Sequence, residues 1–203
     1  MNKKTIGLLF SGGTKSSLIL NKYLKEGKIV HAIYIKSGYS YEYTELMYAR
    51  RTISYLNVMY PNQVVFKIID VSSLSQKSLG IVSNQKDNII PLRRMTLATI
   101  ASLYIAQNNI DILGIGSQES PEYPDGTTKY IDSLEDLIKK GLGNKNFKID
   151  KPFFYLTKKE IIENYYEEKL FEYDFIFSCV NPKDNKKCGT CYKCKNLEEV
   201  LKK

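Results

Sequence analysis

Several features that assign a sequence to a common protein class are absent from this 203-residue chain. It has no apolar run long enough to cross a membrane, and its first residues lack the apolar stretch of a secretory signal. Its single histidine, His31, lies in an apolar stretch and is expected to be packed or hydrogen-bonded locally. Its first 178 residues contain no cysteine, and the four cysteines of the chain begin with Cys179. These absences argue against a membrane protein and a secreted disulfide scaffold, so we expect a cytoplasmic protein.

Positive charge is in excess, with 30 lysines and arginines against 22 acidic residues and a formal net charge of +8. A nucleic-acid partner is one interpretation, because basic residues neutralise phosphates. However, lysine is scattered through the whole sequence without an arginine-rich stripe, which favours simple solvation of exposed faces. We therefore expect no direct nucleic-acid binding, and a homodimer stays open. The lysines that would best suit a nucleic acid surround the cysteines: Lys183, Lys186, Lys187, Lys193 and Lys195.

A short apolar segment, residues 4–10, breaks into a small-residue loop before a helical pattern that starts near Leu18. Glycines let the backbone approach a ligand, and the N–H groups at a helix start attract anions. Neither the G-x-x-x-x-G-K-[ST] loop nor the G-x-G-x-x-G loop occurs in this stretch. An ordinary strand-to-helix turn would also explain the glycines. The other interpretation, which we adopt as the hypothesis, is a phosphate-binding site formed by Ser11, Gly12, Gly13, Thr14, Ser16 and Ser17.

The four cysteines follow the pattern Cys179-x8-Cys188-x2-Cys191-x2-Cys194. Four thiolates complete the tetrahedral shell of a structural Zn²⁺, and this spacing suits a tight metal-binding knuckle. Two disulfides are disfavoured because three of the cysteines crowd on one short loop. A zinc shell filled by protein ligands has no open position for substrate, so catalysis is expected elsewhere.

Strand and helix patterns alternate along the rest of the chain. Residues 29–35, 63–69 and 110–115 have strand patterns, and residues 43–59 and 92–107 have helix patterns. This alternation predicts an α/β fold with a doubly wound parallel sheet, whose ligands bind beyond the carboxyl ends of the strands. Residues 71–90 are polar and unpatterned, either a loop over the site or a connector. We expect one domain over residues 1–170, with a zinc-binding segment over residues 171–203 packed on it.

Five ordered motifs, which span nearly the whole sequence, resemble the 7-cyano-7-deazaguanine synthases (QueC family) of the N-type ATP pyrophosphatases. Residues 11–16 (SGGTKS) are similar to the SGGxDS phosphate loop, and the cysteine pattern is similar to the zinc site of that family. Residues 91–101 resemble its P-x-R-N-x-x-F-L-x-x-A helix, and residues 123–125 match its YPD. Residues 149–161 resemble its I-x-x-P-x-x-x-L-x-K-x-E-I segment.

The resemblance implies a fold of the adenine nucleotide α hydrolase type, with ATP and Mg²⁺ beside the structural zinc. It also implies adenylation of the carboxylate of 7-carboxy-7-deazaguanine, which ammonia converts to an amide and, with a second ATP, to a nitrile. Such chemistry requires cations and N–H groups around the phosphates and no protein nucleophile. On this basis we expect Lys15, Arg93 and Asp125 to be catalytic. The residues expected to bind substrate are Gly38, Tyr39, Glu119 and Tyr123.

Three departures from the family pattern bear on activity. Lys15 replaces the acidic residue of the loop, so that an ammonium either neutralises pyrophosphate or marks weakened turnover. Arg94 replaces the asparagine of the R-N pair, and its role stays open. Residues 37–41 (SGYSY) replace Y-G-Q-R-H at the end of a predicted strand, which indicates altered substrate recognition. Two alternatives stay open: a relative that activates another carboxylate, on a protein or a modified base, and a zinc-stabilised nucleotide-binding module without turnover.

Overall fold

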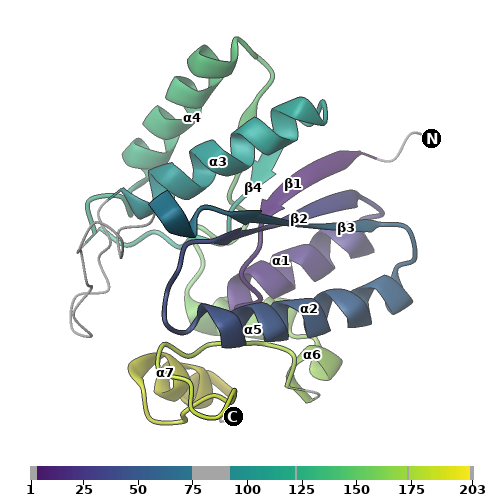
Figure 1. Ribbon diagram of the computed structural model, residues 1–203, viewed down its shortest axis with the longest axis vertical. Coiled ribbons are helices and arrows are strands. Elements are labelled where there is room, and N and C mark those ends of the chain that lie inside the picture. Colours follow the sequence, from purple (N-terminus) through teal and green to yellow (C-terminus); the bar gives the residue numbers. More distant parts are fainter. Residues whose placement is uncertain (1–3, 75–91, 122, 173, 202–203) are drawn as a thin grey trace.

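The computed structural model describes residues 4–74, 92–121, 123–172 and 174–201. Within them, five strands form one sheet in the order β3-β2-β1-β4-β5, and every neighbouring pair is parallel (Figure 1). Parallel neighbours need crossover connections, which the helices supply. The predicted doubly wound parallel sheet is therefore confirmed. The strands are β1 (Thr5–Leu9), β2 (Ile29–Lys36), β3 (Val64–Asp70), β4 (Ile112–Gly114) and β5 (Lys148–Asp150).

Helices cover both faces of this sheet (Figure 1). One face carries α3 (Arg93–Gln107) and α4 (Thr128–Leu142), which also contact each other. The opposite face carries α1 (Thr14–Lys25), α2 (Glu42–Met59) and α5 (Lys158–Tyr165). The remaining helices are the 3-10 turn η1 (Ser72–Leu74), α6 (Glu168–Glu172) and α7 (Tyr192–Leu201). No helix in the described ranges is long and apolar enough to cross a membrane.

The central strands are mainly apolar because both of their faces are covered by helices. Ile6 and Leu8 of β1 pack toward α1 and α2, whereas Ile33 of β2 and Leu113 of β4 pack toward α3 and α4. Side chains that alternate between two covered faces produce the continuous apolar runs seen in the sequence. The edge strand β3 differs, since the side chain of Val65 is 42% exposed.

The structure differs from the sequence-based expectations at several elements. Helix α1 begins at Thr14 rather than near Leu18, because Gly13 already occupies the N-cap position. Helix α4 and the three-residue strand β5 were not predicted. Of the unpatterned residues 71–90, residues 72–74 form η1 and residues 75–90 lie outside the described part of the chain.

The carboxyl ends of β1, β2 and β4 meet at one edge of the sheet, where parallel α/β proteins bind their ligands. The cysteine-containing segment reaches the same edge. There the N–H of Phe177 donates to the carbonyl of Gly12 at 2.9 Å, which ties this segment to the loop after β1. Helix α7 in turn contacts α5.

Candidate functional site

The loop between β1 and α1 has a conformation that depends on glycine and on serine hydrogen bonds. Gly12 has a φ of +72°, and a Cβ there would lie 2.9 Å from the Cα of Ala49 on α2. The hydroxyl of Ser16 donates to the carbonyl of Gly13 at 3.1 Å, and the N–H of Ser11 donates to that hydroxyl at 3.3 Å. Helix α2 and these bonds therefore hold the loop in one shape.

This loop leads into the N-terminus of α1, where the first N–H groups have no partner within the helix. The hydroxyl of Thr14 is buried and has no hydrogen-bond partner among the described residues. Gly116, which follows β4, approaches so closely that a Cβ there would lie 3.3 Å from the backbone nitrogen of Ser16. A phosphate fits the donors and the dipole of such a site.

A cavity of about 600 Å³ opens beside this helix start. Its inner wall is apolar, formed by residues such as Leu9, Ile35 and Leu97. Its polar lining contains more cations than carboxylates. The cations are Lys15, Arg93, Arg94, Lys158 and Lys193, and the carboxylates are Glu42, Glu45 and Asp125.

The three carboxylates of the cavity already have partners. Glu42 accepts the N–H groups of Ser37 and Gly38 at 2.5 and 2.8 Å. Glu45 accepts the hydroxyl of Tyr34 at 2.9 Å. The carboxylate of Asp125 lies 3.9 Å from Arg94, which also donates to the Asp125 carbonyl. The cavity is therefore suited to an anionic ligand.

Lys15 points its amine into this cluster of cations. Its Nζ donates to Oε1 of Gln118 at 3.0 Å, and Gln118 donates in turn to the carbonyl of Leu156 at 2.6 Å. Burial, followed by the charges of Arg94, Lys158 and Lys193, lowers the pKa of Lys15 to about 8. A bound phosphate would oppose these effects and favour the charged amine.

The structure brings most of the predicted site residues to the cavity. Four predicted nucleotide- or substrate-binding residues, and the cysteines Cys188, Cys191 and Cys194, lie outside its lining. Ser17 is fully buried, and its N–H donates to the carbonyl of Gly13 at 3.0 Å. Gly38 donates to Glu42, and exposed Glu119 accepts the hydroxyl of Thr128 at 2.8 Å. Gly12 contributes through its contacts with α2 and Phe177. The predicted residues that do line the cavity are Ser11, Gly13, Thr14, Lys15, Ser16, Tyr39, Arg93, Tyr123, Asp125 and Cys179.

Sequence reasoning missed Glu45, Gln118 and Lys193 as cavity residues. The sequence did indicate the place of Lys193, because a residue between Cys191 and Cys194 must lie close to the cysteine cluster. Glu45 and Gln118 carried none, because a glutamate in a helix and a glutamine after a strand are usually solvated. As expected, His31 is satisfied locally, with its Nδ1 3.0 Å from the hydroxyl of Tyr104.

The four cysteine sulfurs converge at the C-terminal segment and lie within 4.8 Å of one another. The Sγ–Sγ distances are 3.6 Å for Cys179–Cys188, 3.9 Å for Cys179–Cys191 and 3.5 Å for Cys191–Cys194. A tetrahedral metal with bonds of about 2.3 Å to sulfur places its ligands about 3.8 Å apart. The cluster therefore fits one metal ion held by four thiolates.

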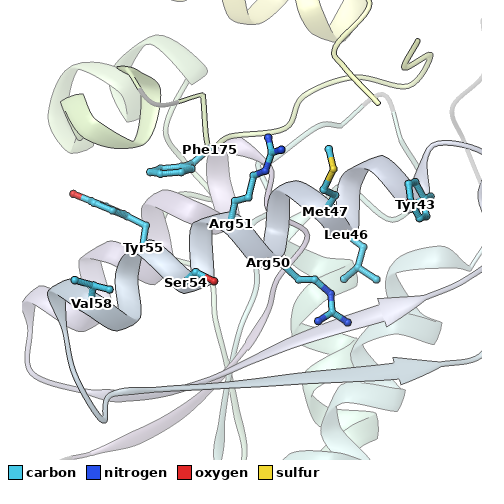
Figure 2. Close-up of a pocket in the computed structure, with 9 residues that line it drawn as sticks. All are labelled: Tyr43, Leu46, Met47, Arg50, Arg51, Ser54, Tyr55, Val58 and Phe175. Atoms are coloured by element: carbon cyan, nitrogen blue, oxygen red, sulfur yellow. The ribbon is translucent and has the colours of Figure 1, made fainter. Parts of the chain in front are cut away.

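A second cavity, of about 830 Å³, lies along α2 and shares no lining residue with the first (Figure 2). Two of its aromatic residues, Tyr55 and Phe175, stack with their ring centres 5.1 Å apart. Arg50 and Arg51 are its charged lining residues. Because it contains no part of the glycine loop, this groove is not the candidate nucleotide site.

Comparison with known proteins decides the family. The family model "Queuosine biosynthesis protein QueC" matches residues 5–203. The chain belongs to the QueC family. A 7-cyano-7-deazaguanine synthase from Leptospira interrogans is 31% identical over 206 residues, covering 95% of this chain and 84% of the relative. One from Pseudoalteromonas atlantica is 27% identical, covering 97% of this chain and 93% of the relative. The resemblance found from the motifs of this QueC-family sequence is thus confirmed.

Solved structures agree on the fold of this QueC-family chain. A 4-thiouridine synthetase in complex with RNA and bound ATP superposes with a TM-score of 0.62 at 15% identity, over 97% of this chain. This chain spans only 49% of that protein. The U34-tRNA thiolase NcsA from Methanococcus maripaludis, with its [4Fe-4S] cluster, superposes with a TM-score of 0.55 at 19% identity, covering 98% of this chain and 65% of the thiolase. At these identities the likeness shows a shared fold.

Proposed function

We propose that this QueC-family chain uses ATP to adenylate a carboxylate and transfers the acyl group to ammonia, as in the formation of 7-cyano-7-deazaguanine. The names of its relatives, 7-cyano-7-deazaguanine synthases, support this product. The observation that carries the proposal is the cationic cavity that joins the glycine loop after β1 to Arg93 at the start of α3. A nucleotide and an acidic substrate can both find positive partners there.

Each part of the cavity has a role in this proposal. The loop and the start of α1 hold the pyrophosphate that leaves, with Thr14 offering its unpartnered hydroxyl and Lys15 a positive charge. The apolar wall near Leu9 and Leu97 accommodates the adenine. We assign Arg93, whose guanidinium lies 5.0 Å from the centre of the Tyr39 ring, to the acceptor.

The proposed reaction begins when a carboxylate oxygen of the acceptor attacks the α-phosphorus of ATP and pyrophosphate leaves. Ammonia then attacks the acyl carbon, AMP leaves with the oxygen, and a proton passes to solvent to give the amide. A second ATP activates the amide oxygen in the same way, and loss of AMP and a proton leaves the nitrile. Electrostatic stabilisation of the phosphates is the main task of the protein.

Two metals belong to the proposal. Mg²⁺ would neutralise phosphate charge when it binds with ATP, and Asp125 is the cavity carboxylate that we assign to it. Zn²⁺ would be held by Cys179, Cys188, Cys191 and Cys194, whose closed shell suits a structural role. Reduced thiolates are available to zinc in the cytoplasm, where we place the protein.

A second candidate keeps the chemistry and changes the acceptor. Residues 37–41 replace the Y-G-Q-R-H segment of the family, and Tyr39 of this segment lines the cavity. A changed wall at this point favours a differently shaped carboxylate, on a protein or a modified base.

Incubation with ATP, Mg²⁺, ammonia and 7-carboxy-7-deazaguanine distinguishes these candidates. We expect pyrophosphate release and, by mass spectrometry, loss of 1 mass unit on forming the amide and of a further 18 on forming the nitrile, roughly as the balanced steps require. Pyrophosphate release with other carboxylates only would favour the second candidate. No release with any carboxylate, despite ATP binding, would leave a nucleotide-binding module.

A further inference from the structure

Arg93 is a partly buried cation that forms no ion pair with any residue of the described ranges. Its side chain is partly buried and lines the candidate nucleotide cavity. Its hydrogen bond to the hydroxyl of Tyr41 is long, at 3.5 Å, and no carboxylate lies within ion-pair distance in the described ranges. A guanidinium offers five N–H donors, so most of its capacity is unused.

Two tyrosines in the loop between β2 and α2 lie beside this guanidinium. Tyr39 and Tyr41 stack with their centres 5.5 Å apart and their planes at 7°. Arg93 lies 5.0 Å from the centre of the Tyr39 ring, and the amine of Lys193 lies 5.8 Å from that of Tyr41. Cation–π contact orients both cations but leaves their charges unneutralised.

Glu45 is the nearby acidic residue, and it does not serve as the missing partner. Its carboxyl accepts the hydroxyl of Tyr34 at 2.9 Å. Burial raises the pKa of Glu45, although Arg93 opposes the shift, so this carboxyl is inclined to hold a proton. Arg93 itself stays charged, because a guanidinium does not lose its proton in proteins. Buried charge without a partner is costly, and an anionic ligand would relieve this cost.

We propose that Arg93 and Lys193, held over the Tyr39–Tyr41 pair, form a subsite for the carboxylate of the acceptor. The inference rests on the proposed function and divides its cavity: the glycine loop takes the nucleotide, and this subsite takes the acid. Arg93 supplies the planar fork that matches a carboxylate, and Lys193 a second positive charge. Tyr39 and Tyr41 are positioning residues, and they occur where the chain departs from the family pattern.

The subsite also links the cysteine cluster to the cavity. Lys193 lies in the first turn of α7, between Cys191 and Cys194. A metal bound by these cysteines would fix the start of α7 and with it the amine of Lys193. In this way a site closed to substrate still sets the position of a substrate-binding residue.

The test compares the binding of 7-carboxy-7-deazaguanine with that of the neutral 7-cyano-7-deazaguanine, by calorimetry with a non-hydrolysable ATP analogue present. The wild-type protein should prefer the acid by about tenfold or more, as charge-assisted hydrogen bonds do. Arg93→Met and Lys193→Met should each reduce this preference while the affinity for the ATP analogue is kept. Tyr39→Phe keeps the stacked ring and should keep the preference, whereas Tyr39→Leu should weaken it.

Lys195→Met, at an exposed position of the same helix, is the matched control and should leave the preference unchanged. Equal binding of acid and nitrile by the wild type, or a preference that survives in both Arg93→Met and Lys193→Met, would overturn the subsite. If the wild type binds the ATP analogue but neither deazaguanine, the proposed acceptor fails instead. Benzoate and benzamide then test the subsite: benzoate should raise Tm more than benzamide, and Arg93→Met should cancel the difference. Equal shifts would overturn the inference.

Discussion

Lys15 lies in the first turn of α1, at the position where the phosphate loop of the family carries an acid. Gln118 holds its amine, and burial with three neighbouring cations brings its pKa down to about 8. The amine is thus close to losing its proton just above neutral pH, and a bound anion would favour its charged form. We therefore expect the exchange of charge at this position to affect nucleotide binding most.

Nucleotide affinity should depend on the protonation of Lys15. Its pKa lies below the ordinary value of 10.5, so its charge is present at pH 7 and is lost as the pH rises through about 8. We expect the affinity for Mg²⁺-free ATP, measured by calorimetry, to fall by up to roughly tenfold between pH 7 and pH 9, as the charged fraction does.

Two variants separate Lys15 from the other lysines of the cavity. Lys15→Arg keeps its charge to pH 9 and should show a flatter profile, and Lys15→Met should bind weakly at every pH. Identical profiles for the wild type and Lys15→Arg would show that the amine of Lys15 does not contact the phosphates.

At the scale of elements, the C-terminal segment forms part of the wall of the candidate nucleotide cavity. Phe177 bonds to the loop after β1, and Cys179 packs with Phe177 and with Tyr48 of α2. Helix α7 then contacts α5, which carries Lys158 at its first position. The predicted division of the chain at residue 170 stays a prediction, and these contacts lead us to expect that both parts unfold together.

Zinc analysis tests the cysteine cluster. We expect about one zinc per chain in the purified protein, and Cys191→Ala should lower the free energy of unfolding by several kcal/mol, as loss of a structural metal does. Lys195→Ala, on the same helix, should change it little. Iron with labile sulfide in place of zinc, or unchanged stability after complete metal removal, would contradict a structural zinc.

The sequence was informative where one chemical requirement dictated the residues. Cysteine spacing predicted the four-cysteine cluster that could hold a metal ion, and the apolar residues 4–10 predicted β1. The sequence did not predict features that depend on tertiary contacts. Strand β5, which pairs with β4, has three residues and is too short to show a hydrophobic pattern. Glu45 and Gln118 became cavity residues only through the packing of α2 and the turn after β4. The stacking of Tyr39 on Tyr41 likewise depends on a loop conformation that no spacing encodes.

Across the whole molecule, which has a net charge of +8, the positive side chains are not evenly distributed. Cations from α1, α3, α5 and α7 converge on one cavity at the carboxyl edge of the sheet, and its carboxylates are already paired. Four separate helices thus supply charge to one site, which a parallel sheet permits because all its strands end on the same side. This convergence is the basis on which we propose ATP-dependent carboxylate activation for the chain.

The transfer of oxygen from acceptor to AMP tests this assignment most directly. The protein is incubated with ATP, Mg²⁺, ammonia and 7-carboxy-7-deazaguanine whose carboxylate carries ¹⁸O, and the nucleotide products are analysed by mass spectrometry. Adenylation predicts AMP that contains one ¹⁸O in its phosphoryl group, because the attacking carboxylate oxygen leaves with AMP. Label in inorganic phosphate with ADP as product, or AMP that contains no ¹⁸O, would contradict the account.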